Sequence, residues 1–356
     1  MGWWRVNADT LASSRFVVSP LAETLASLKV LERGVGAHPG ERAWLAAHLG
    51  PYRARQARNP LAARVLWAAL RPTWNADFLT PTPPYEGERD FAREVARVRA
   101  TPPEAARRDL VVALGARLPA ELERDDLAES AAATLEWVWR ETVLPTWPRR
   151  RRIVEADVVA RTAQLSQGGW AAALDAMRPG MRWLGDSRLQ VNPRDLPPRE
   201  LHGARLLFVP VTPQQSWVTW ETEAADPGAA SAAASAAASG PARYAVVYPC
   251  AGALAESVRA PVPEGLGALL GTARAAVLVL LDTPKSTTQL VALTGQRLGS
   301  VGRHLRVLLD ARLVQRRRAG RSVLYYRTDA GHALVGAQDD LAGNRPGQDG
   351  GGRLTV

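Results

Sequence analysis

Residues 298–308 have the sequence LGSVGRHLRVL, and this stretch decides how the carboxyl-terminal part of the chain folds. At about 100° per residue, Val301, Leu305 and Leu308 lie within about 60° of one another and form an apolar helix face. Arg303 and Arg306 lie roughly opposite. We therefore expect a helix over about 299–312, with one face in a core and a basic face turned to solvent.

The sequence on either side predicts a helix-turn-helix followed by a β-hairpin. Residues 285–295 begin with cap-type side chains and end at glycine, which indicates a short helix, and a turn at 296–298 follows it. Residues 313–315 and 322–327 are typical of strands, and the basic turn 316–321 joins them. This hairpin would be a wing, and 266–281 would be an apolar helix ahead of the whole module.

A basic face on an exposed helix suits the major groove of DNA. Arginine can donate two parallel hydrogen bonds to guanine, and serine can reach bases or phosphates. The wing arginines would meet phosphates or a neighbouring minor groove. The His304 side chain has two possible positions, beside the groove-facing side of the helix or packed under the helix. The candidate DNA-binding residues are Thr287, Thr288, Gln289, Ser300, Arg303, His304, Arg306, Arg316, Arg317, Arg318 and Arg321.

These residues resemble the ArsR-type (arsenical-repressor-like) winged helix-turn-helix regulators. The matching positions are the stretch 298–308, Leu313-Val314, the Arg318-Ala319-Gly320-Arg321 wing and Tyr325-Tyr326. The resemblance covers about residues 264–335. It implies DNA-binding transcriptional control, usually by a homodimer joined through the first and last helices of the module, here about 266–281 and 328–337.

The sequence departs from the family pattern at three places. Gly302 stands where serine is common, and Arg312 stands where a glycine usually ends the helix. Either Arg312 adopts the left-handed conformation, which costs about 1 kcal/mol for a residue other than glycine, or the helix ends differently. The helix over 287–294 has no Cys, His, Asp or Glu, which argues against metal sensing through thiolates there. No metal site and no cofactor is expected.

The net charge of +10 is unevenly distributed. Residues 271–335 carry 11 basic and 3 acidic side chains, so less than a fifth of the chain holds most of the excess. Such a field suits a polyanion such as double-stranded DNA, although a solvated basic surface would look the same. No stretch approaches the ~18 apolar residues of a membrane span. With Cys250 the single cysteine and no signal peptide at the start, we expect a cytoplasmic protein without membrane contact.

The complete chain is predicted to be an α+β multidomain protein. Residues 1–178 read as a mainly helical regulatory region, with helices near 21–33, 41–49, 60–70, 87–99, 103–117, 121–143 and 153–177. Residues 179–257 read as a β-rich segment that contains a disordered Ala/Ser insertion, 226–241. A linker, 258–265, would lead to the winged helix at 266–335, and a disordered tail, 336–356, would follow.

Two further features of the first 257 residues have more than one interpretation. The run Arg149-Arg150-Arg151-Arg152 predicts a solvated turn or an accessory phosphate contact. The tryptophans are candidates for core packing or for the wall of an apolar pocket that binds a small-molecule effector. The six considered are Trp137, Trp139, Trp170, Trp183, Trp217 and Trp220.

Together these observations predict a sequence-specific transcriptional regulator rather than an enzyme. Two alternatives stay open. The winged helix could be a protein-interaction module that never touches DNA, or catalysis could reside in the amino-terminal region, although no catalytic motif is found there.

Overall fold

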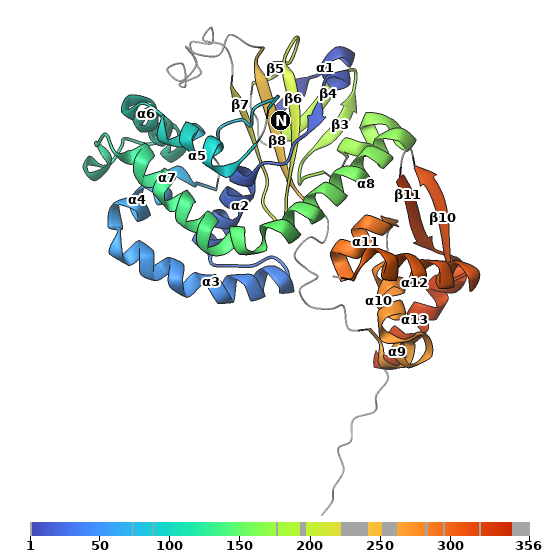
Figure 1. Ribbon diagram of the computed structural model, residues 1–356. Coiled ribbons are helices and arrows are strands. Elements are labelled where there is room, and N and C mark those ends of the chain that lie inside the picture. Colours follow the sequence, from blue (N-terminus) through green and yellow to red (C-terminus); the bar gives the residue numbers. More distant parts are fainter. Residues whose placement is uncertain are drawn as a thin grey trace, which may run out of the picture. The chain divides into compact units, whose positions relative to one another are not determined.

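The computed structural model describes residues 2–72, 74–87, 89–175, 177–192, 197–221, 241–250, 262–281, 284–294, 296–319 and 322–343. The protein is a mixed α+β structure, as the sequence predicts, and it divides into two compact units, Met1–Ser257 and Val258–Val356 (Figure 1). The predicted Ala/Ser insertion lies almost entirely outside the described residues, as do the first half of the linker and the end of the tail.

Before residue 178, unit 1 contains a helix in every region where the sequence predicts one, with shifted ends, and one short helix at its start that was not predicted. They are α1 (Ala8–Ala12), α2 (Pro20–Arg33), α3 (Pro39–Arg58), α4 (Pro60–Ala69), α5 (Phe91–Arg99), α6 (Pro103–Leu114), α7 (Leu127–Val138) and α8 (Trp147–Leu174). Short helical turns lie at Asp77–Leu79, Ala120–Leu122, Trp139–Val143 and Leu144–Thr146. Helix α3 continues through Pro51 rather than ending at 49, and α8 bends at Gly169, where φ is +68°.

Unit 1 also contains two four-stranded sheets. The central sheet has the order β2-β6-β8-β7, formed by Arg15–Phe16, Arg205–Val211, Arg243–Pro249 and Trp217–Glu221. Strands β2, β6 and β8 are parallel, and β7 is antiparallel to β8. The smaller sheet has the order β3-β4-β1-β5, formed by Arg182–Gly185, Arg188–Asn192, Gly2–Arg5 and Arg199–Glu200.

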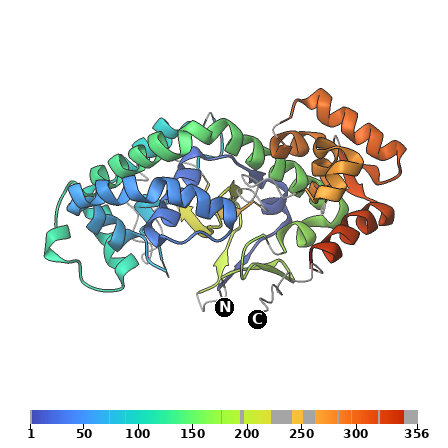
Figure 2. The ribbon, with the colours of Figure 1, turned by 90° about the horizontal axis from the view of Figure 1, so that it is seen from below.

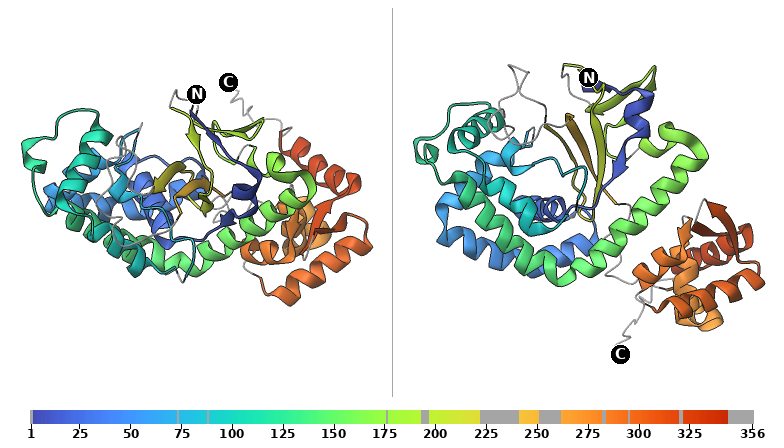
Figure 3. Two further views of the ribbon diagram at one scale, coloured as in Figure 1. Left: turned by 90° about the horizontal axis from the view of Figure 1, so that it is seen from above. Right: turned by 45° about the horizontal axis from the view of Figure 1, so that its top comes forward.

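Both faces of the central sheet are buried, which explains the unbroken apolar runs of β6 and β8. Leu207, Val209 and Val247 belong to a core that they share with α2–α7. Alternate residues, such as Phe208 and Val246, face a second core shared with the smaller sheet. Figures 2 and 3 show the helices α2–α7 gathered on one side of these strands. The predicted boundary at 178/179 is therefore a change of secondary structure within one compact unit.

Helix α2 lies at the centre of the first core. Ser19 caps it by accepting a hydrogen bond from the Ala22 amide at 3.0 Å, and Gly34 ends it in the left-handed conformation. Every residue from Pro20 to Leu31 is buried, so α2 has no solvent-facing side before its last two residues, which are exposed. Burial extends around the whole circumference of this part of the helix because other elements surround it.

Near the start of the predicted β-rich segment, strands β3 and β4 form a hairpin. Asp186 and Ser187 form its turn, with φ values of +48° and +60°. Two consecutive left-handed residues are characteristic of a tight hairpin turn. The amino-terminal strand β1 lies between β4 and β5, because it pairs antiparallel with the first and parallel with the second.

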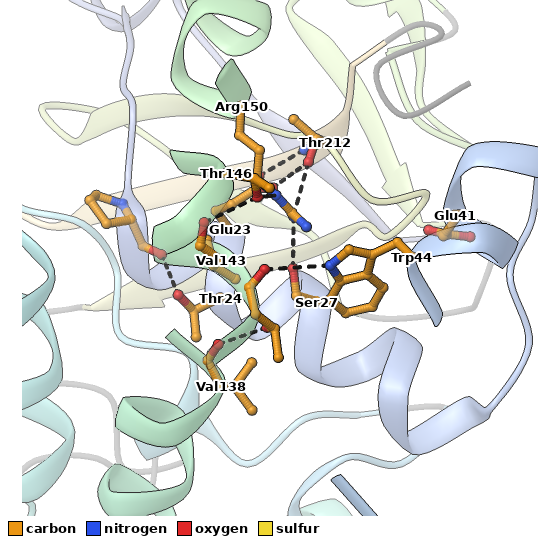
Figure 4. A network of polar contacts seen from close by, with 12 residues as sticks. Glu23, Thr24, Ser27, Glu41, Trp44, Val138, Val143, Thr146, Arg150 and Thr212 are labelled. Carbon is orange, nitrogen blue, oxygen red and sulfur yellow. Dashed lines mark hydrogen bonds and ion pairs between the residues drawn. The ribbon is translucent and has the colours of Figure 1, made fainter. Parts of the chain in front are cut away.

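The four-arginine run is not a solvated turn, and its second residue, Arg150, is too buried to contact a phosphate. The run lies in α8, and the side chain of Arg150 is only 2% exposed. Its Nη1 lies 2.7 Å from Oε1 of Glu23, which is 1% exposed. Nη1 also donates to Ser27 Oγ at 3.0 Å, and Nε donates to Thr146 Oγ1 at 3.0 Å (Figure 4).

Glu23 extends this buried network to the end of strand β6. Its Oε2 accepts a hydrogen bond from the Thr212 amide at 2.8 Å, and its Oε1 accepts one from the Thr212 hydroxyl. The Arg150 guanidinium also lies 5.4 Å from the centre of the Trp44 ring. The network thus joins α2, α8 and the residue after β6, and we name it the Arg150 network.

The six tryptophans considered above pack against the cores. Trp217 is 6% exposed within the first core, and Trp139 stacks on Phe91 with 4.7 Å between ring centroids. Trp137 packs against the first core, while Trp170, Trp183 and Trp220 pack against the second. The core interpretation is therefore confirmed for these side chains.

Unit 2 contains five helices and a three-stranded sheet within its described part. The elements are α9 (Glu264–Leu270), α10 (Thr272–Leu280), β9 (Lys285–Ser286), α11 (Thr287–Thr294), α12 (Leu298–Asp310), β10 (Val314–Ala319), β11 (Ser322–Arg327) and α13 (Asp329–Gly343). The strand order is β10-β11-β9, with antiparallel pairs. A single core includes Leu266, Leu278, Leu290 and Leu305.

Several boundaries in unit 2 differ from the prediction. Strand β10 continues to Ala319, so most of the range predicted as the turn 316–321 is strand paired with β11. The helix expected over 266–281 is two helices, because Gly271 has φ of +79° and interrupts the ladder of hydrogen bonds. Helix α9 begins at Glu264, inside the predicted linker. Helix α13 extends to Gly343, beyond the predicted start of a disordered tail at 336; buried Val335 anchors it in the core.

Candidate nucleic-acid interface

Helix α12 has the two faces that its sequence predicts. Val301 is fully buried, and Leu305 and Leu308 are each 1% exposed in the core of unit 2. Arg303 and Arg306 are exposed on the other side of the helix. Because the apolar residues recur at intervals of four and three, burying them forces the two guanidinium groups outward. This arrangement presents two planar cations about one turn apart on a rigid element.

The Ser300 hydroxyl already takes part in hydrogen bonds within unit 2, which the sequence does not indicate. Its side chain is half-buried, and its hydroxyl donates to Gln296 Oε1 at 3.1 Å. The same hydroxyl lies 3.3 Å from His304 Nε2. Ser300 therefore fastens the first turn of α12 to the turn that precedes it. A contact with a base or a phosphate would have to replace or share these hydrogen bonds.

His304 lies between the two faces, half-buried. Burial lowers its pKa, and the Arg274 and Arg303 guanidinium groups lower this pKa further. Since the ordinary value is 6.5, the imidazole is largely neutral at pH 7. His304 therefore offers a hydrogen bond to a partner and no charge. This combines the two readings considered from sequence, a half-packed ring beside the basic face.

The end of α12 departs from the usual glycine-based ending. Arg312 adopts φ of +55°, which is the left-handed conformation that its position predicts. Thr328 holds this turn from the neighbouring segment, because its hydroxyl donates to the Arg312 carbonyl at 2.7 Å. Its amide also donates to the Leu313 carbonyl at 3.1 Å. These bonds fix the angle between α12 and β10.

The β10–β11 hairpin carries its arginines on both faces. Arg316 pairs with Tyr325 and Arg317 with Leu324 across the ladder, and Arg316, Arg317 and Arg318 are all exposed. Successive residues of a strand point to opposite faces. Arg316 and Arg318 therefore share one face, and Arg317 lies on the other. The three cannot all contact one phosphate backbone in the same way, a distinction that the sequence reading did not draw.

The remaining candidates are only partly described. Thr287 begins α11 and is half-buried, while Thr288 and Gln289 follow in that helix with side chains outside the description. Arg321 lies outside the described residues. Arg327, which ends β11, donates to the carbonyls of Leu281 at 3.1 Å and Val279 at 3.3 Å. It therefore ties the hairpin to the end of α10.

Two apolar residues of α12 were not singled out from sequence. Leu298 is 62% exposed at the start of the helix, and Val307 is 38% exposed one turn after Arg303. Exposed aliphatic groups beside arginines are suited to contact with the methyl group of thymine. The sequence contained a sign of this, because neither residue falls on the stripe of Val301, Leu305 and Leu308.

The described residues add two negative findings. Nowhere in them do three or more His, Cys, Asp or Glu side chains gather in a way that could hold a metal ion. None of the described helices combines the length and hydropathy needed to cross a bilayer.

Comparison of the chain with models of protein families, with curated proteins and with solved structures finds no match in any of the three.

Proposed function

We propose that this protein is a DNA-binding transcriptional regulator and that unit 2 is its winged helix-turn-helix, similar to the ArsR-type regulators. The order of elements supports this proposal: two short helices, α11 and α12, are followed by the hairpin β10–β11 and by a last helix, α13. In this interpretation α12 enters the major groove and the hairpin is the wing.

The exposed pair Arg303 and Arg306 is the observation that carries the proposal. Both lie opposite a side of α12 that is buried to 99% or more, so the helix cannot rotate to hide them without exposing its core. Guanidinium groups can pair with the edge of guanine through two parallel hydrogen bonds. Val307 would add contact with a thymine methyl group.

The wing would supply affinity rather than sequence preference. Arg316 and Arg318 share a face of β10 and would meet the phosphate backbone. The concentration of 11 basic against 3 acidic residues over 271–335 attracts the duplex from a distance. A homodimer joined through α9, α10 and α13 would present two such helices to a two-fold symmetric site. Leu269 of α9, 68% exposed, is available for such a contact.

The test is the affinity of the full chain for a duplex that it selects from a random-sequence library, measured by fluorescence anisotropy across a range of salt concentrations. We expect the double variant R303A/R306A to bind at least about thirtyfold more weakly, from about 1 kcal/mol or more per arginine. We expect R316A/R318A to reduce the slope of log affinity against log salt by about 1–2.

A matched control is R58A/R93A, which removes two exposed arginines from unit 1 and the same net charge. Its affinity should stay within about twofold of the wild type, since neither side chain belongs to the proposed interface and an exposed charge outside it acts only through a screened field. Equal losses in the control and in R303A/R306A would contradict the proposal. A wild type that binds no duplex would favour the protein-interaction module instead.

A further inference from the structure

Unit 1 contains a hollow of about 590 Å³ at one edge of its central sheet. Strands β6 and β8 run parallel, and their carboxyl ends meet at this edge. Gln214 follows β6, and Pro249 and Cys250 end and follow β8; all three line the hollow. In sheets of parallel strands, this edge is where ligands are usually bound, because the loops after the strands can be shaped without disturbing the core.

A second wall comes from α8, from the segment that joins it to β3 and from the first residue of β3. This wall supplies three arginines, Arg161, Arg178 and Arg182, against one carboxylate, Asp175. Asp175 is already engaged, because its Oδ1 accepts a hydrogen bond from the Trp183 amide at 3.3 Å. The lining therefore has an excess of positive charge. Apart from Gln214 and Gly180, the rest of the lining is apolar and comes from Met177, Pro179, Met181, Pro249 and Cys250.

Two of the arginines are held in place by the fold. Arg161 lies with its Nε 3.7 Å from Asp157 Oδ2 and with its guanidinium 5.1 Å from the centre of the Tyr248 ring. Arg178 donates from Nη1 to the Val191 carbonyl at 3.0 Å. A guanidinium that is already oriented loses little conformational entropy when it binds an anion.

Arg178 also carries a buried hydrogen-bond donor that has no acceptor in the described part of the protein. Its Nε is buried and has no hydrogen-bond partner among the described residues. Burial lowers the pKa of this guanidinium to about 10. A buried N–H group without an acceptor is unfavourable, and the fold retains one here beside an open hollow. An anionic oxygen entering the hollow would supply an acceptor and a counter-charge.

We infer that this hollow binds a small organic anion, with its acidic group against the three arginines and an apolar body against the methionines and prolines. The class of ligand is a carboxylate, sulfonate or phosphate ester of metabolite size. None of the six tryptophans considered from sequence lines the hollow. The inference does not depend on the proposed DNA binding, because every residue that carries it belongs to unit 1.

The test uses the full chain and the fluorescent dye anilinonaphthalene sulfonate, which joins a sulfonate to an apolar aromatic body. We expect saturable binding of one dye per chain. Arg182→Gln, at an exposed position, should weaken it about tenfold through loss of one charge-assisted contact. Gln214→Glu, isosteric and also exposed, should weaken it comparably by placing a carboxylate in the lining. Phosphate at millimolar concentration should compete with the dye.

Two controls separate this site from general dye adsorption. Arg140→Gln removes an equally charged and 65% exposed side chain outside the hollow, and it should leave the affinity unchanged. The neutral dye phenylnaphthylamine, which lacks the acid, should bind at least about tenfold more weakly. The inference is overturned if the wild type shows no saturable binding, if Arg182→Gln and Gln214→Glu bind the dye as the wild type does, or if the neutral dye binds equally well.

Discussion

Replacing Arg150 with methionine should destabilise unit 1 far more than any other change in the four-arginine run. The substitution keeps most of the side-chain volume but leaves the Glu23 carboxylate, 1% exposed, without its cation. Removing one partner of a buried ion pair typically costs about 3–5 kcal/mol, because the remaining charge stays desolvated. In urea, a loss of this size corresponds to a midpoint lower by about 1–2 M.

Tryptophan fluorescence is the appropriate assay, since all 12 tryptophans precede residue 221 and report on unit 1 alone. The matched control is Arg151→Met. Arg151 is 61% exposed and pairs with Glu155, which is 50% exposed, so its loss should cost less than about 1 kcal/mol. The double variant E23Q/R150M should be more stable than R150M alone, because it leaves no unpaired charge. The reasoning is refuted if R150M costs no more than R151M, or if E23Q and R150M are simply additive.

Three further predictions concern individual side chains. Burial raises the pKa of Glu94 to about 7, so between about pH 4.5 and 7 the native state binds a proton that the unfolded state has lost. The free energy of unfolding should therefore fall as the pH rises through this window. Glu94→Gln should reduce the slope of unfolding free energy against pH by up to about 1.4 kcal/mol per pH unit, measured in urea titrations. Burial lowers the pKa of Lys29 to about 7, so charging this side chain at pH 7 destabilises the folded state. Lys29→Met should therefore raise the free energy of unfolding at pH 7 by more than about 1 kcal/mol, and this gain should shrink toward pH 10. An unchanged or lower stability would show that Lys29 is not desolvated as described. Arg312→Gly relieves a left-handed conformation, so it should raise the opening free energy measured by hydrogen exchange at the α12 and β10 amides by about 0.5–1 kcal/mol. Faster exchange would mean that the arginine side chain stabilises this turn.

The sequence predicted best where one local pattern decides the outcome. The helix α12 and its buried face follow from the spacing of Val301, Leu305 and Leu308, and the left-handed Arg312 follows from its place after the helix. The hairpin β10–β11 follows from two short strand-like runs around a basic turn. These features need only neighbours within about 15 residues, so periodicity and turn chemistry suffice.

Prediction failed where the deciding partner is distant in the chain. Arg150 looks like any other arginine of its run until Glu23, 127 residues earlier, is placed beside it. The position of β1 inside a sheet depends on strands β4 and β5, which begin at Arg188 and Arg199. The hollow between Gln214, Cys250 and the arginines of the α8–β3 wall likewise brings together three separate segments. No local pattern records such pairings.

The central claim is that α12 reads DNA sequence through Arg303 and Arg306, and selection of bound duplexes from a random library by the full chain tests it most directly. We predict enrichment of a motif that contains guanine, in two half-sites about one helical turn apart, and loss of the guanine preference in R303A/R306A while R58A/R93A retains the motif. The same motif enriched by the wild type and by R303A/R306A, or no motif at all, would contradict the claim.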